Sequence, residues 1–133
     1  MYKRQILLDI LTIDPEWYNW SASKLSLVTE SHELIINDII YTEISIGFDK
    51  IEDLETTFSG NFFRIAPMTK ETLFLAGKAF LSYKSNGGKK NSVLPDFFIG
   101  AHASVLQIPL LTRDVSRYKT YFPKLELISP EHN

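Results

Sequence analysis

The chain has 133 residues, of which 44% are hydrophobic and 23% are charged, as is ordinary for one globular domain with a real core. The 14 basic and 16 acidic residues give a net charge of −2, so any nucleic-acid binding must use a local basic patch. The absence of cysteine excludes disulfides, thiolate metal sites and cysteine nucleophiles.

The apolar runs do not suit a membrane span or an export signal. Charged residues break every run well short of the ~20 residues that a span needs. Lys3 and Arg4 precede an apolar stretch, but Asp9 and Asp14 interrupt that stretch, unlike a signal peptide. We therefore expect no membrane association and a cytoplasmic location.

The first half of the chain alternates between strand and helix patterns. An apolar run over residues 5–9 predicts a buried strand, and Asp14-Pro15-Glu16 is typical of a helix start. The apolar face of that helix comprises Trp17, Trp20, Leu25 and Val28. Residues 34–36 predict a second strand, after which Asn37 can cap a helix that carries Ile39, Ile40, Ile44 and Phe48.

The second half continues the alternation. A helix is expected over residues 50–58, a strand over 62–65, and a long helix from Thr69 that ends at Asn86-Gly87-Gly88. The residues expected on the buried side of the long helix are Leu73, Phe74, Gly77, Phe80 and Leu81. A helix over 96–106, a strand over 110–112, a short helix over 115–121 and a strand over 125–128 follow. This order predicts a single domain over residues 1–133, a three-layer α/β/α sandwich with a central parallel sheet.

Acidic residues fall where such a sheet binds ligands, at the carboxyl ends of its strands. Asp9 ends the first apolar run, Asp96 begins an apolar helix, and Asp114 follows the strand over 110–112. Glu43 shares a helix face with Ile39 and is therefore expected to be partly buried. Each acid also has a plain alternative: a turn residue at Asp9, a helix cap at Asp96 and at Asp114, and a surface or salt-bridged side chain at Glu43.

Taken together, the four acids indicate a site for a hard cation. Carboxylate oxygens suit Mg²⁺ or Mn²⁺ rather than zinc. A Mg²⁺ ion held in this way usually keeps water and binds a phosphate, and the activated water can attack that phosphate. The acids alone do not select the phosphoester.

The other candidate functional residues give weaker evidence of function than the acids. The basic residues are either a rim for a phosphate backbone or a solvated surface, and they comprise Lys84, Lys89, Lys90, Arg113, Arg117 and Lys119. The three histidines have no mutual ligand spacing; His102 is expected to be packed or exposed, and Tyr118 to be a core residue. There is no phosphate-binding glycine loop, no G-x-S-x-G and no H-E-x-x-H.

In these residues the chain resembles a known family, the PIN domain, and more narrowly the VapC-type ribonuclease toxins of bacterial VapBC toxin–antitoxin pairs. The residues that carry the resemblance are 36–45, 76–84, 87–88, 94–103, 111–114 and 117–123. They include Leu94-Pro95-Asp96-Phe97-Phe98-Ile99-Gly100-Ala101-His102-Ala103 and Leu111-Thr112-Arg113-Asp114.

The resemblance implies a PIN-like fold and Mg²⁺-dependent cleavage of RNA, with Mn²⁺ able to substitute. It implies that Asp96 holds the metal, that Glu43 and Asp114 hold or orient metal and water, and that Thr112 supports the cluster. Asp9 would complete the metal set. RNA-binding residues would be Arg113, Arg117, Lys89 and Lys90. The implied partners are a small antitoxin that blocks the site and a second copy of the chain.

One departure from the family pattern leaves two alternatives open. The family's first strand ends in an acid followed two places later by Asn, whereas Asp9 is followed by Ile10-Leu11. Either Asp9 is the first metal acid before a shortened loop, or residues 6–12 match the segment after the usual motif, so that the first strand and its acid are missing or replaced by residues 1–5. Spacing favours the second alternative. In that case we expect a non-catalytic module that binds RNA or the antitoxin. A different metal-dependent phosphatase or a DNA nuclease is the third hypothesis.

Overall fold

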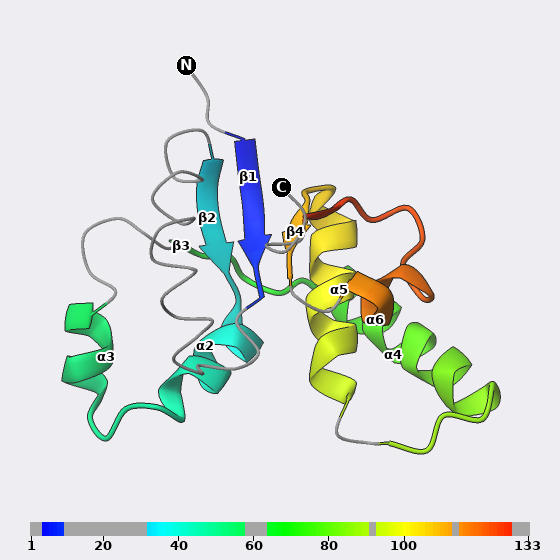
Figure 1. Cartoon of the computed structure of the whole chain (residues 1–133), viewed down its shortest axis with the longest axis horizontal. Coiled ribbons are helices and arrows are strands. Elements are labelled where there is room, and N and C mark those ends of the chain that lie inside the picture. Colours follow the sequence, from blue (N-terminus) through cyan, green and yellow to red (C-terminus); the bar gives the residue numbers. More distant parts are fainter. Residues whose placement is uncertain (1–3, 10–31, 58–63, 91–92, 113–114, 129–133) are drawn as a thin grey trace.

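A single parallel sheet organises the protein. The structure is a computed structural model, which describes residues 4–9, 32–57, 64–90, 93–112 and 115–128 (Figure 1). The strands are β1 (Arg4–Leu8), β2 (His32–Ile36), β3 (Arg64–Ile65), β4 (Leu110–Leu111) and β5 (Leu127–Ile128). They lie in the order β3-β2-β1-β4-β5, and every neighbouring pair is parallel. The predicted α/β fold with a parallel sheet is therefore confirmed.

The central strand β1 sets the position of the sheet's carboxyl edge. Its residue Leu7 pairs with Ile35 of β2 on one side and with Leu110 of β4 on the other. All of these residues are buried, as expected for a parallel sheet. The ladder continues beyond the strands, because the Asp9 N–H donates to the Leu111 carbonyl (2.9 Å) and the Thr112 N–H donates to the Ile128 carbonyl (2.9 Å). Asp9 and Thr112 are thereby fixed at the same edge.

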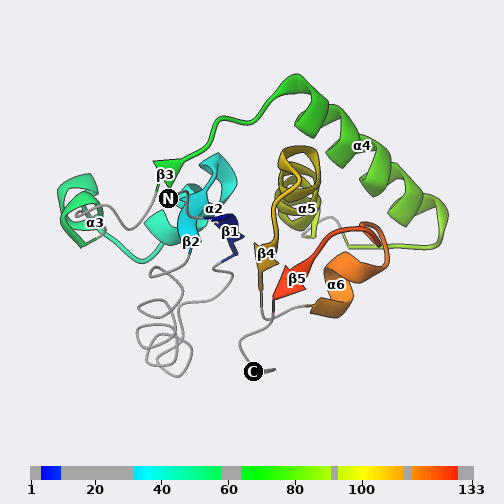
Figure 2. The same ribbon diagram turned by 90° about the horizontal axis from the view of Figure 1, so that it is seen from above.

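The described helices are α2 (Asp38–Ser45), α3 (Ile51–Thr57), α4 (Lys70–Ser85), α5 (Leu94–Leu106) and α6 (Val115–Lys119). Figure 2 shows α5 over one face of the sheet and α4 packed on the outer side of α5. The helix predicted from Asp14 lies outside the described residues. In the part of the chain that the structure describes, no helix is long and apolar enough to cross a membrane.

Helix α4 begins and ends as the sequence predicts. The Thr69 hydroxyl accepts a hydrogen bond from the Thr72 N–H at 3.2 Å, which caps the first turn. At the other end Gly87 has φ +92°, and its N–H donates to the Lys84 carbonyl at 3.2 Å. That left-handed conformation favours glycine, so Gly87 ends the helix.

The predicted buried side of α4 is wrong for all of its residues except Phe80, which is partly buried. Leu73, Phe74 and Leu81 are 46%, 67% and 57% exposed, and Gly77 is exposed as well. The helix instead buries Thr72 and Ala76, with Leu75, Ala79, Phe80 and Tyr83 partly buried on the same side. Apolar residues occur on both sides of this helix, so their spacing did not determine which side faces the core.

An aromatic cluster joins α4 to α5 and explains the orientation of α4. The Phe97 ring lies 5.5 Å from the rings of Phe80, Tyr83 and Tyr121, and 6.2 Å from that of Phe122, centroid to centroid. These edge and tilted contacts add stability beyond simple burial, roughly 0.5–1.5 kcal/mol for each pair. The cluster therefore fixes the first turn of α5, which also carries Asp96.

Candidate metal centre

Three of the four predicted acids converge at the carboxyl edge of the sheet. Asp9 follows β1 and is 2% exposed, Asp96 lies in the first turn of α5 and is 5% exposed, and Glu43 is partly buried on α2. Burial raises the pKa of Glu43 to about 7, and the charges of Asp9 and then Asp96 contribute to the same increase. Two acids from distant parts of the chain thus act electrostatically on the third.

Glu43 shows why this edge suits a cation. Within the described residues its Oε1 atom is buried and has no hydrogen-bond partner. A buried carboxylate oxygen without a donor is costly unless the group keeps a proton or meets a positive charge. Carboxylate oxygens are the ligands that Mg²⁺ and Mn²⁺ prefer, so the chemistry of the donor atoms at this edge suits such an ion.

Asp9 is held in place by two hydroxyl groups. Its Oδ2 atom accepts hydrogen bonds from the Thr112 hydroxyl at 2.9 Å and from the Tyr118 hydroxyl at 2.8 Å. Thr112 was predicted to support the cluster. Tyr118 was expected only as a core residue; it is 1% exposed, and its contact with Asp9 was missed. No local pattern marks that contact, because 109 positions separate the two residues.

The cap alternative for Asp96 is wrong. Helix α5 begins at Leu94 rather than at Asp96; its N-cap residue is Val93, which has no side-chain cap, and Pro95 occupies the first turn. Proline is well suited to that place because its lack of an N–H has no cost in the first turn. Asp96 therefore lies inside the helix, with its side chain buried at the end that faces the other acids.

A buried polar pair connects the two helices that carry Glu43 and Asp96. Asn37 caps α2, since its Oδ1 atom accepts a hydrogen bond from the Ile40 N–H at 2.9 Å. Its Nδ2 atom is therefore the donor to His102 Nδ1, 3.1 Å away on α5. His102 is fully buried, and burial lowers its pKa, although the backbone of Pro67 and the Asp38 carboxylate oppose this shift. His102 is thus packed, one of the two predicted states.

The remaining predicted site residues are only partly described. Asp114 and Arg113 lie outside the described residues, as does the side chain of Arg117. Lys89 and Lys90 are exposed on the loop that leads from α4 to the helix of Asp96. Among the side chains that the structure describes, no group of three or more acids or histidines is arranged so that it could hold a metal ion.

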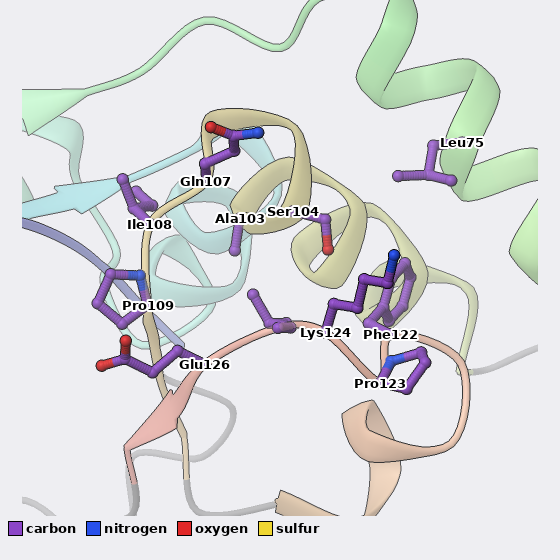
Figure 3. A pocket seen from close by; sticks show the side chains of 11 residues that line it. Leu75, Ala103, Ser104, Gln107, Ile108, Pro109, Phe122, Pro123, Lys124 and Glu126 are labelled. Atoms are coloured by element: carbon purple, nitrogen blue, oxygen red, sulfur yellow. The ribbon is translucent and has the colours of Figure 1, made fainter.

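A pocket lies elsewhere in the fold. Its volume is about 560 Å³, and Figure 3 shows its lining from the end of α5, the segment before β4 and the segment before β5. Ile108 and Pro109, which line it, precede β4, whereas Thr112 at the acidic edge follows that strand. The pocket is therefore at the opposite end of β4 from the acids.

Comparison with known proteins shows the class of fold. No protein-family model and no curated protein matches the chain. Among solved structures, the fold is that of chains in toxin–antitoxin complexes, which confirms the predicted likeness to VapC-type PIN toxins at the level of the fold.

Three of these structures illustrate the likeness. VapBC2 from Rickettsia felis, bound to a DNA fragment from their promoter, gives a TM-score of 0.69 at 18% identity, over 94% of this chain and 98% of that chain. FitAcB from Neisseria gonorrhoeae gives a TM-score of 0.69 at 19% identity, over 96% of this chain and 99% of that chain. A toxin–antitoxin complex from Klebsiella pneumoniae gives a TM-score of 0.66 at 21% identity, over 94% of this chain and 97% of that chain.

Proposed function

We propose that the protein is a Mg²⁺-dependent endoribonuclease and the toxin of a toxin–antitoxin pair. The observation that carries this proposal is the convergence of Asp9, Glu43 and Asp96 at one sheet edge, where their charges act on Glu43. A group of acids that perturb one another in this way is typical of sites for phosphoester hydrolysis rather than of surface ion pairs.

The residues that would hold the ion are Asp9, Glu43 and Asp96, with Asp114 as the fourth ligand. When bound, Mg²⁺ or Mn²⁺ would lower the pKa of a water molecule and stabilise negative charge on the phosphate oxygens.

The other proposed roles concern binding and position. Thr112 holds Asp9 through its hydroxyl group. Lys89 and Lys90 are exposed at the approach to α5, where we propose that they receive the RNA backbone together with Arg113 and Arg117. A short basic rim of this kind fits a chain whose net charge is only −2.

The proposed partners are a small antitoxin protein, which blocks the site, and a second copy of the chain. VapBC and FitAB structures of the same fold are complexes, three of them described as bound to DNA. Leu73, Phe74 and Leu81 on α4 have exposed apolar side chains. Such side chains commonly mark surfaces that another protein covers, which supports binding to a partner protein. We place the complex in the cytoplasm.

The test is RNA cleavage by the purified protein and by the Asp96→Asn variant, in EDTA and after addition of Mg²⁺. We expect Mg²⁺ to start cleavage by the wild type and the substitution to abolish it while the circular dichroism spectrum stays unchanged. Asp49→Asn removes an exposed carboxylate from the loop after α2 and is the matched control, which should cleave normally.

Full activity of Asp96→Asn would refute the assignment of the site. A wild type that binds RNA but cleaves none with either Mg²⁺ or Mn²⁺ would instead support the non-catalytic module. Cleavage of DNA in preference to RNA would show that the substrate is DNA, and it would leave the proposed metal centre unchanged.

A further inference from the structure

Two hydroxyl groups donate to the same oxygen atom of Asp9. The Thr112 hydroxyl, at the end of β4, and the Tyr118 hydroxyl, on α6, both reach Oδ2, at 2.9 and 2.8 Å. All three side chains are buried, so water does not compete with these bonds. Hydrogen bonds to a charged acceptor in such surroundings are among the stronger ones in proteins.

The number of donors matters because each carboxylate oxygen has two lone pairs. Two hydroxyl donors at hydrogen-bond distance use both lone pairs of Oδ2. We infer that Tyr118 and Thr112 are positioning residues that restrict Asp9 to binding a metal ion through one oxygen, and that this restriction selects Mg²⁺ or Mn²⁺ over Ca²⁺. The inference rests on the proposed metal-dependent function.

The selection follows from how the two kinds of cation coordinate. Ca²⁺ takes six to eight oxygen ligands and often binds a carboxylate through both oxygens. Mg²⁺ requires an octahedral shell, keeps several waters, and uses one or two carboxylates. An Asp9 side chain that can offer only one oxygen therefore penalises Ca²⁺ more than Mg²⁺. Tyr118 contributes half of this restriction through a single hydroxyl oxygen.

The experiment measures metal binding rather than activity. Mn²⁺ is titrated into the metal-free protein and followed by electron paramagnetic resonance, and Mg²⁺ or Ca²⁺ is then added to displace it. The variants are Tyr118→Phe and Thr112→Val, each of which removes one donor to Asp9. Tyr83→Phe is the matched control, because its hydroxyl accepts from the Lys90 N–H rather than donating to one of the acids.

We expect the ratio of Mg²⁺ to Ca²⁺ affinity to fall on the order of tenfold in Tyr118→Phe, within the range that outer partners of metal ligands contribute. Thr112→Val should shift the ratio in the same direction, and Tyr83→Phe should leave it unchanged. If Tyr118→Phe does not fold, Thr112→Val decides the question alone.

The outcomes separate this inference from the proposed function. If the folded variants keep the wild-type ratio of Mg²⁺ to Ca²⁺ affinity while the wild type still binds Mn²⁺, the two hydroxyls do not select the ion. That result would leave the proposed metal centre intact. A wild type that binds no divalent ion would overturn both. Equal weakening for Mg²⁺ and Ca²⁺ would also overturn the selectivity, because it indicates general loss of structure at Asp9.

Discussion

Glu43→Gln should stabilise the protein when no metal ion is present. At pH 8 the Glu43 carboxylate is charged, partly buried beside Asp9 and Asp96, and lacks a donor for Oε1 within the described residues. Glutamine keeps the shape of the side chain and removes that charge. The usual effect of replacing a site residue is loss of function, so a gain in stability is a specific sign of stored repulsion.

The expected gain in the free energy of unfolding follows from the shift in the pKa of Glu43. The difference between the ordinary value of 4.5 and about 7 corresponds to about 3 kcal/mol if it were fully expressed. Because Glu43 is partly exposed, solvent screening reduces this, and we expect about 1–2 kcal/mol. For a chain of this size that is an increase of about 3–8 °C in Tm.

The pH dependence has a definite sign. Below pH 4.5 the carboxyl group is protonated in both the folded and the unfolded chain, and it costs nothing. Between pH 4.5 and about 7 the folded protein retains a proton that the unfolded chain has released, so wild-type stability falls as the pH rises. Above about pH 7 the cost is complete. The advantage of Glu43→Gln should therefore be near zero at pH 4.5 and full at pH 8.

The assay is thermal unfolding in EDTA at a series of pH values, with Glu52→Gln as the control. Glu52 is exposed on α3, and its replacement makes the same change in charge away from the acids. Addition of Mg²⁺ at pH 8 should stabilise the wild type more than Glu43→Gln. A variant that is less stable than the wild type at pH 8, or an advantage that does not change with pH, would refute the reasoning.

Two further predictions concern how the site is supported. Asn37→Ala should lower the free energy of unfolding by about 2–4 kcal/mol in a urea titration, because α2 loses its cap and His102 Nδ1 loses its buried donor; a loss below about 1 kcal/mol would contradict this. Leu73→Gln should change it by no more than about 0.5 kcal/mol, since Leu73 is exposed; a loss above about 2 kcal/mol would indicate a buried position.

Much of the fold follows from local patterns in the sequence. Parallel strands are buried on both faces, so β1 and β2 appear as short, continuous apolar runs. Helix ends are also local: Asn37 and Thr69 cap α2 and α4 as predicted, and Gly87 ends α4. The orientation of α4 is not local, because it depends on aromatic partners that lie far along the chain.

The candidate site divides in the same way. Because the carboxyl ends of parallel strands and the starts of the helices that follow them lie at one edge of a sheet, the positions of Asp9, Glu43 and Asp96 in the sequence favour their convergence. Asp9 lies at the end of the central strand, which favours the alternative in which it is the first acid of the site. The hydrogen bond of the Tyr118 hydroxyl could not be predicted, because its partner lies 109 positions away and only the folded chain brings α6 beside the end of β1.

The central claim is that the acids at the carboxyl edge bind a divalent ion that drives RNA hydrolysis. The most direct measurement is RNA cleavage by the purified chain during titration with Mg²⁺ after complete removal of metal. The account predicts no cleavage in EDTA and a rate that rises with Mg²⁺ to saturation, with Mn²⁺ able to substitute. Cleavage at the same rate in EDTA as in Mg²⁺ would contradict it.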